Sequence, residues 1–130
     1  MPISRESKAK TALVGALKQR GHYARRIEDQ FAVGVLDIIT VFKFDDKIWF
    51  IEAKIINGNY FGMTERQYVE AQRLTKTANT GVATCLVGYK EAEKKWYVSA
   101  PSTKVHVDDC LQQGDGELFE TLLMRWRNLQ

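Results

Sequence analysis

Three charged residues stand inside apolar segments of the stretch GVLDIITVFKFDDKIWFIEAK, residues 34–54: Asp37, Glu52 and Lys54. Two apolar, β-branched runs flank the polar centre of this stretch, which predicts a β-hairpin. Unpaired charges are costly in a buried strand, so charges at these positions indicate an ion pair or a chemical role. Two carboxylates beside an ammonium group are the side chains of a metal-assisted hydrolytic site.

The side-chain period of a strand decides whether these charges meet. A period of two puts Glu52 and Lys54 on one face. A two-residue loop at residues 45–46 pairs Asp37 with Lys54 and Ile39 with Glu52, so all three charges share that face. An alternative stays open, because on a solvent-facing hairpin Asp37 and Lys54 form only a cross-strand ion pair.

Magnesium prefers hard oxygen ligands in octahedral geometry. We expect Asp37 and Glu52 to bind Mg²⁺, for which Mn²⁺ can substitute, and the main-chain carbonyl of Ala53 to supply a further oxygen. Lys54 is then placed to position a water molecule or to stabilise negative charge on a phosphate group.

A helix is predicted from Ser4, a good N-cap, to about Arg20, with Gly21 as its C-terminal stop. Glu6 lies one heptad before Leu13, on the apolar stripe of this helix. Two interpretations of Glu6 stay open: a first-turn acid favoured by the helix dipole, or a side chain directed at the site on which the helix packs.

The segment after the hairpin carries a second helix. Tyr60 and Phe61 are expected in a loop, as aromatic side chains that either stack on nucleic-acid bases or fold back onto the core. Thr64 begins the helix and Gly81 ends it. Thr64 and Gln67 fit a capping box, so Gln67 serves either as a cap or as a site residue.

The remaining segments complete a mixed sheet. We predict an edge strand within residues 22–27, a buried strand at 82–87, its hairpin partner at 96–99 and a C-terminal helix within 116–129, with no element assigned to 105–113. The helix between the central hairpin and the buried strand implies that these strands are parallel neighbours. The expected fold class is α/β, a small mixed β-sheet flanked by helices.

The chain has 130 residues, 45% hydrophobic and 27% charged, which fits a single domain over residues 1–130. A net charge of +3 permits a nucleic-acid partner without demanding one. Cys85 and Cys110 are too far apart for a Cys-x-x-Cys pair and fit a reducing compartment. Without an apolar run of membrane-spanning length or a signal peptide, a cytoplasmic protein without membrane contact is expected.

The segment GVLD at residues 34–37, followed by EAK at residues 52–54, resembles the motif of the PD-(D/E)xK nuclease superfamily. The pattern is most similar to VRR-NUC-type and archaeal Holliday-junction-resolvase-type nucleases, and it covers about residues 6–89. Leu36 departs from it, since proline is often found there, but that proline is not needed for metal binding. The resemblance implies a restriction-endonuclease-like αβββαβ core.

The same resemblance implies roles for the residues that match its motif. Asp37 and Glu52 correspond to metal ligands, Lys54 to the catalytic lysine, Glu6 to an accessory acid, and Gln67 to a residue that orients the lysine or the substrate.

The expected function is that of a metal-dependent endonuclease hydrolysing DNA phosphodiester bonds, selective for branched or junction structure. Phosphate contacts are expected from basic residues around the site: Arg25, Arg26, Arg66, Arg73 and Lys76. Cutting two strands favours a homodimer. The C-terminal helix with Trp126 and the Tyr60–Phe61 loop are the candidate interfaces, and ordinary packing within one chain is the alternative for each. The alternative function is a non-catalytic nucleic-acid- or partner-binding module with a nuclease-like fold. A sequence-specific restriction enzyme is less expected, because little chain remains for a reading domain.

Overall fold

The computed structural model describes residues 4–27, 36–44, 46–78, 81–112 and 119–129. The motif positions Gly34 and Val35 and the loop residue Asp45 lie outside these ranges. The helices of the described chain are α1 (Arg5–Gln19), α2 (Glu65–Ala78) and α3 (Phe119–Asn128), with a short 3-10 helix at Val107–Asp109. Its strands are β1 (Tyr23–Arg26), β2 (Ile38–Val41), β3 (Ile48–Ile55), β4 (Tyr60–Phe61), β5 (Val82–Lys90), β6 (Lys95–Ser99), β7 (Val105–His106) and β8 (Leu111–Gln112).

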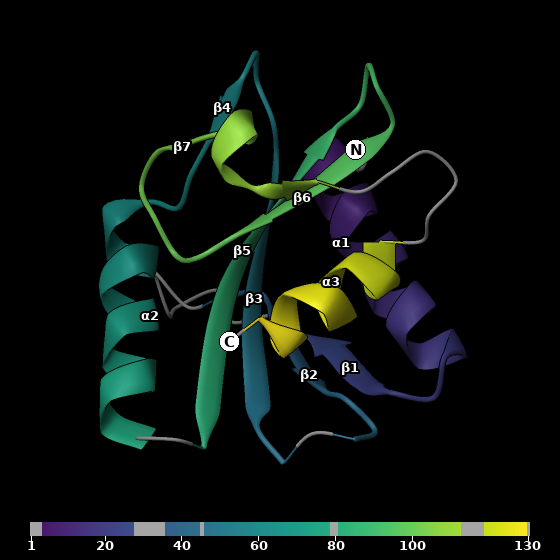
Figure 1. The fold of residues 1–130 in the computed structure, drawn as a ribbon, viewed down its shortest axis with the longest axis vertical. Coiled ribbons are helices and arrows are strands. Elements are labelled where there is room, and N and C mark those ends of the chain that lie inside the picture. Colours follow the sequence, from purple (N-terminus) through teal and green to yellow (C-terminus); the bar gives the residue numbers. More distant parts are fainter. Residues whose placement is uncertain (1–3, 28–35, 45, 79–80, 113–118, 130) are drawn as a thin grey trace.

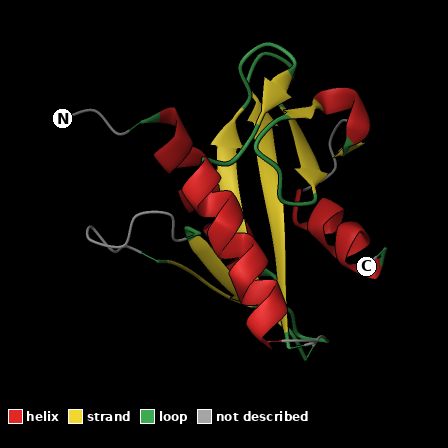
Figure 2. Cartoon of the chain, turned by 90° about the vertical axis from the view of Figure 1, so that its left-hand side faces the viewer, coloured by secondary structure: helices red, strands yellow, loops and turns green. Residues whose placement is uncertain are grey.

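Within the described residues, six strands form a mixed sheet in the order β1-β2-β3-β5-β6-β8. β3 and β5 are parallel and joined by α2, and the other neighbouring pairs are antiparallel. The predicted α/β class, with its parallel pair, edge strand and αβββαβ order of core elements, is confirmed. Figure 1 shows α2 on one side of β3 and β5 and α1 and α3 on the other, and Figure 2 shows α3 beside the strands from a second direction.

Local signals set the bounds of α1. The Ser4 side chain accepts a hydrogen bond from the N–H of Ser7 at 3.1 Å, which satisfies a donor of the first turn. At the other end Gly21 has a φ of 83°, a left-handed conformation that favours glycine. The N–H of His22 donates to the carbonyl of Leu17 at 3.1 Å and closes the last turn. The predicted cap and stop are both confirmed.

The central hairpin differs from its predicted register. Ile39 pairs with Phe50 and not with Glu52, so the two-residue loop at residues 45–46 is wrong. The connection between β2 and β3 is longer and runs from residue 42 to residue 47. The pairing is displaced by two positions, and an even displacement leaves every side chain on its predicted face.

Packing of Phe42 explains the longer connection. Its side chain is buried, and its ring lies edge-on to His22 and Trp49, with centroid distances of 5.2 and 6.0 Å. An aromatic side chain of this size stabilises the core more than one further ladder pair stabilises the hairpin. Phe44, two residues later, is 82% exposed. The strand therefore ends at Val41.

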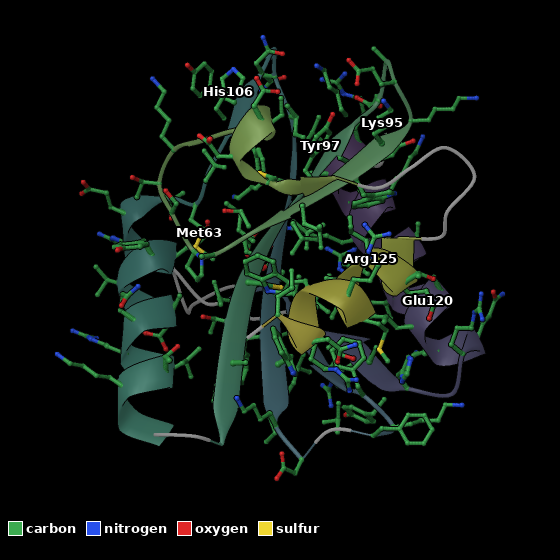
Figure 3. All side chains as sticks on the ribbon, viewed as in Figure 1. Met63, Lys95, Tyr97, His106, Glu120 and Arg125 are labelled. Carbon is green, nitrogen blue, oxygen red and sulfur yellow. The ribbon has the colours of Figure 1, made fainter. Side chains whose placement is uncertain are left out.

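The sheet separates two groups of buried side chains. One group joins α1 and α3 to the sheet and includes Leu13, Ile51 and Leu122. The other includes Leu86 and Met63, and Figure 3 shows Met63 between α2 and the strands. Both faces of the central strands are thus covered, as expected for strands with near-continuous apolar runs. Among the described residues, no helix is long and apolar enough to cross a membrane.

The predicted loop at Tyr60 and Phe61 is wrong, because these residues form β4, which pairs with β7. Phe61 is buried, and Tyr60 remains 48% exposed beside the ring of His106. Gly62 permits this close pairing, since a Cβ atom there would lie 2.0 Å from the carbonyl oxygen of Thr103. The segment 105–113, to which no element was assigned, contributes β7, the 3-10 helix and β8.

Candidate active site

The charged residues of the central hairpin meet beside the N-terminal half of α1. Lys54 Nζ lies 3.5 Å from Glu52 Oε2 and 3.8 Å from Glu6 Oε1. The main-chain N–H of Asp37 donates to Glu52 Oε1 at 3.3 Å. The structure therefore brings Glu6, Asp37, Glu52 and Lys54 into one cluster. Glu6 faces this cluster, which favours its interpretation as a side chain directed at the site over that of a first-turn acid stabilised by the helix dipole.

Glu52 is the most deeply buried member of the cluster, with 0% of its surface exposed. Among the described residues, its buried Oε2 atom has no hydrogen-bond partner, although two ammonium groups lie 3.4 and 3.5 Å away. Burial raises the pKa of Glu52, while the charges of Lys10 and Lys54 oppose this rise. A buried carboxylate oxygen without a hydrogen bond is costly unless a cation uses it.

Lys10 also belongs to this cluster, although the sequence did not lead us to it. Only 5% of its surface is exposed. Its ammonium donates to Asp37 Oδ2 and lies 3.4 Å from Glu52 Oε2 and 3.7 Å from Glu6 Oε2. The sequence does hold a signal, because Lys10 stands four residues after Glu6 and three before Leu13. The Lys10 ammonium therefore lies on the apolar stripe of the helix, one turn after the Glu6 carboxylate. This spacing predicts that both side chains reach the same site.

The chemistry of the donors fits a hard divalent cation. Glu6, Asp37 and Glu52 offer carboxylate oxygens, of which Glu52 Oε2 is buried and lacks a hydrogen bond within the described chain. Ala53, the predicted carbonyl ligand, lies between the two charged residues of β3. The carboxylates nevertheless converge on the Lys10 ammonium. Accordingly, the described ranges contain no group of three or more acidic, histidine or cysteine side chains arranged to hold a metal ion.

Gln67 takes part in the predicted capping box at the start of α2. Its Oε1 atom accepts from the N–H of Thr64 at 3.0 Å, and its own N–H donates to Thr64 Oγ1 at 3.1 Å. Among the described residues, the hydrogen bonds of the capping box join Gln67 to Thr64, and no hydrogen bond or ion pair joins its side chain to the carboxylate cluster. The capping box accounts for Gln67 at the start of α2.

The predicted phosphate-binding residues fall into two groups. Arg26 points to α1, where its Nη1 donates to Ser7 Oγ at 2.9 Å and to Thr11 Oγ1 at 3.4 Å. Its guanidinium therefore holds the edge strand against the helix. The others are exposed: Arg25, Arg66, Arg73 and Lys76. Arg66 and Arg73 line a surface hollow that also holds Glu65 and Glu70, so its charge is mixed.

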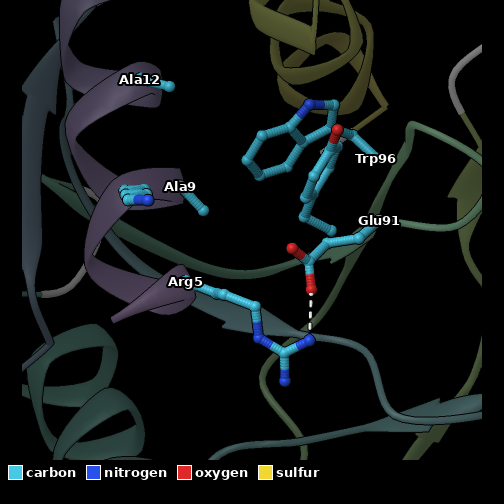
Figure 4. A pocket seen from close by; sticks show the side chains of 7 residues that line it. Arg5, Ala9, Ala12, Glu91 and Trp96 are labelled. Carbon is cyan, nitrogen blue, oxygen red and sulfur yellow. Dashed lines mark hydrogen bonds and ion pairs between the residues drawn. The ribbon is translucent and has the colours of Figure 1, made fainter. Parts of the chain in front are cut away.

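A cavity of about 360 Å³ lies between α1 and the hairpin of β5 and β6 (Figure 4). Ala9 and Ala12 form its helix side, and Trp96 faces them across the opening. Arg5 bridges its rim by an ion pair with Glu91 at 2.9 Å. Arg5 and the exposed Lys8 thus place positive charge on the N-terminal half of α1. The sequence pattern had indicated neither of these two residues.

Comparisons with known proteins bear on the fold. The structure of Hjc, a Holliday junction resolvase from the archaeal hyperthermophile Archaeoglobus fulgidus, is similar with a TM-score of 0.61 and 12% sequence identity. The similarity covers 78% of this chain and 88% of that chain. No family model and no curated protein matches the sequence. At this identity the similarity shows a shared fold, which is the fold implied by the resemblance to PD-(D/E)xK nucleases.

Proposed function

We propose that this chain is a divalent-metal-dependent endonuclease that hydrolyses DNA phosphodiester bonds and selects branched or junction DNA. The observation that carries the proposal is the convergence of Glu6, Asp37, Glu52 and Lys54 from three separate segments. A protein that only binds nucleic acid gains nothing from carboxylates at its binding site, because they repel phosphate groups. The resolvase fold supports the same function.

Each residue of the cluster has a role in this proposal. Asp37 and Glu52 would bind Mg²⁺, or Mn²⁺ in its place, with the carbonyl of Ala53 as a further ligand. The bound metal would polarise the scissile phosphate and lower the pKa of a water molecule. Lys54 would orient that water or stabilise negative charge on the phosphoryl oxygens. Glu6, 3.8 Å from the Lys54 ammonium, would hold that ammonium in place.

DNA phosphates would be bound by exposed basic side chains, which position the backbone without reading its sequence. The proposed contacts are Arg25, Arg66, Arg73 and Lys76, with Arg5 and Lys8 added from α1. Arg26 would contribute by holding α1 against the edge strand. The Gln67 side chain would orient Lys54 or the substrate with its amide nitrogen, since Oε1 is engaged in the cap.

The test is a cleavage panel of linear, nicked, flapped, four-way and single-stranded DNA, with Mg²⁺ and with a chelator. We expect Mg²⁺-dependent cutting that favours the four-way or flapped substrate. Asp37→Ala and Lys54→Ala should each lower the rate by about 1000-fold, because each removes charge that acts in the transition state.

Matched controls are Asp108→Ala and Lys18→Ala, which remove exposed side chains of the same types elsewhere in the protein. Both should cut at the parental rate, and circular dichroism should show all four variants folded. If Asp37→Ala and Lys54→Ala cut as fast as the parent, the site assignment is wrong. DNA binding without cutting under any metal condition would establish the non-catalytic module instead.

We propose further that the protein acts as a homodimer, because resolving a branched DNA requires two cuts. Trp126 packs against the core and Phe61 is buried, so among the described residues the exposed large apolar side chains of the two predicted interface regions are Leu129 and Tyr60. Light scattering after size-exclusion chromatography should give about twice the chain mass of 14.9 kDa. A monomer mass at all concentrations, with cutting retained, would contradict the dimer.

A further inference from the structure

Lys10 lies where the three carboxylates of the cluster meet. Its ammonium donates to Asp37 Oδ2 and lies 3.4 Å from Glu52 Oε2 and 3.7 Å from Glu6 Oε2. The side chain is 6% exposed, so water does little to screen these contacts. A lysine ammonium is a compact point charge with three donors. It thus supplies positive charge to all three carboxylates.

Lys54 does not occupy the same position. Its ammonium contacts Glu52 and Glu6, at 3.5 and 3.8 Å, and it is 19% exposed. Lys10 is the ammonium in contact with Asp37 as well, and Asp37 and Glu52 are the two proposed metal ligands. A divalent cation bound by these two carboxylates would meet the Lys10 charge at close range, where repulsion between like charges is strong.

We propose that Lys10 is a built-in counter-cation, which holds the carboxylates together in the metal-free protein and competes with the divalent metal for them. Metal binding then requires the Lys10 ammonium to leave Asp37. Its flexible stem permits this movement, and Glu6, 38% exposed and one helical turn away, offers an ion-pair partner nearer to solvent. The inference rests on the function proposed above, and it adds a residue that sets the metal affinity of that site.

The first test measures Mn²⁺ binding to the whole protein by isothermal titration calorimetry, independently of cleavage. Lys10→Met keeps the aliphatic stem and removes the charge, so we expect the Mn²⁺ dissociation constant to fall by about tenfold or more. Lys18→Met is the matched control, because Lys18 is exposed on the same helix and outside the proposed site. It should change the dissociation constant by less than about twofold, since an exposed charge is screened. Lys54→Met should have a smaller effect than Lys10→Met.

The second test needs no variant and so does not depend on the fold of Lys10→Met. Amine-reactive labelling of the parent protein, read by mass spectrometry, should modify Lys10 slowly in chelator because the amine is buried. Mg²⁺ should raise the labelling rate of Lys10 several-fold, and the exposed Lys8 should be labelled equally with and without metal. An unchanged or lower labelling rate of Lys10 with Mg²⁺ would overturn the proposal.

The outcomes separate this inference from the proposed function. If the parent binds Mn²⁺ and cuts DNA but Lys10→Met binds no more tightly, the competition is wrong and the nuclease assignment stands. If neither protein binds Mn²⁺, both proposals fail. Tighter binding by Lys10→Met than by the parent supports the competition whatever the preferred DNA is.

Discussion

Two buried glutamates lie near opposite ends of α1, and their surroundings differ. Glu52 lies beside the N-terminal half of the helix, whereas Glu120 lies at the start of α3, close to the C-terminal end of α1 (Figure 3). Glu120 Oε1 is 2.8 Å from Arg20 Nε, and Glu120 Oε2 is 3.8 Å from His22 Nε2. Each oxygen of Glu120 thus has one polar neighbour, whereas Glu52 Oε2 lies near two ammonium groups, at 3.4 and 3.5 Å.

The charge balance of the two places differs as well. Around Glu52, three carboxylates face the two ammonium groups of Lys10 and Lys54, which leaves one negative charge in excess. Around Glu120, the guanidinium of Arg20 balances the carboxylate, while burial lowers the pKa of His22 and favours its neutral form. Both acids are buried, so burial alone does not distinguish them. Under the proposed function, the excess of carboxylates around Glu52 is the distinguishing feature.

The largest expected effect would separate the two glutamates by activity. Glu52→Gln keeps the shape of the side chain but weakens a proposed metal ligand, so we expect cleavage to fall by about 1000-fold with the fold intact. Glu120→Gln should cut within about twofold of the parent. It should instead lower the thermal midpoint by about 4 °C, corresponding to roughly 1 kcal/mol, a small cost because Arg20 is half exposed and screened.

Cleavage rates and thermal melts of the two variants, measured side by side, check this contrast. Equal losses of cleavage in both variants would show that the two places do not differ in function. An unchanged thermal midpoint in Glu120→Gln would show that the ion pair of Glu120 and Arg20 contributes little to stability.

A smaller effect concerns the pH dependence of stability. Burial raises the pKa of Glu52 from its ordinary value of 4.5, with Lys10 and Lys54 opposing and Glu6 reinforcing the rise. At a pH between the ordinary pKa of Glu52 and its raised pKa in the folded protein, the folded protein binds more protons than the unfolded chain. The contribution of Glu52 to stability therefore falls as pH rises through this window. Relative to the parent, Glu52→Gln should gain up to about 1.4 kcal/mol for each pH unit of this window.

Urea unfolding of the parent and Glu52→Gln in chelator, from pH 4.5 upward, measures this difference. His22 gives the opposite pH dependence of stability. Because its pKa is lowered, its contribution to stability falls as pH drops below 6.5. Both proteins contain His22, so its effect cancels in the comparison. If the difference in stability between the two proteins does not change with pH, burial does not raise the pKa of Glu52.

Local signals in the sequence predicted much of the fold. The Ser4 cap, the Gly21 stop and the Thr64–Gln67 capping box were predicted correctly because each depends on residues a few positions apart. The buried strand at 82–87 followed from a continuous apolar run. The length of the loop between β2 and β3 was predicted wrongly, because it depends on where Phe42 packs, against His22 and Trp49.

The sequence alone determined that Glu52 and Lys54 share a face, because side chains in a strand have a period of two. Asp37 was predicted on the same face and stays there because the register differs by an even number of residues. Only the tertiary structure decided that Lys10 joins them. Helical periodicity puts Lys10 on the buried stripe of α1, but it does not say which strand residues that stripe will meet. That choice depends on how α1 packs across the sheet, which brings one ammonium within reach of Glu6, Asp37 and Glu52 together.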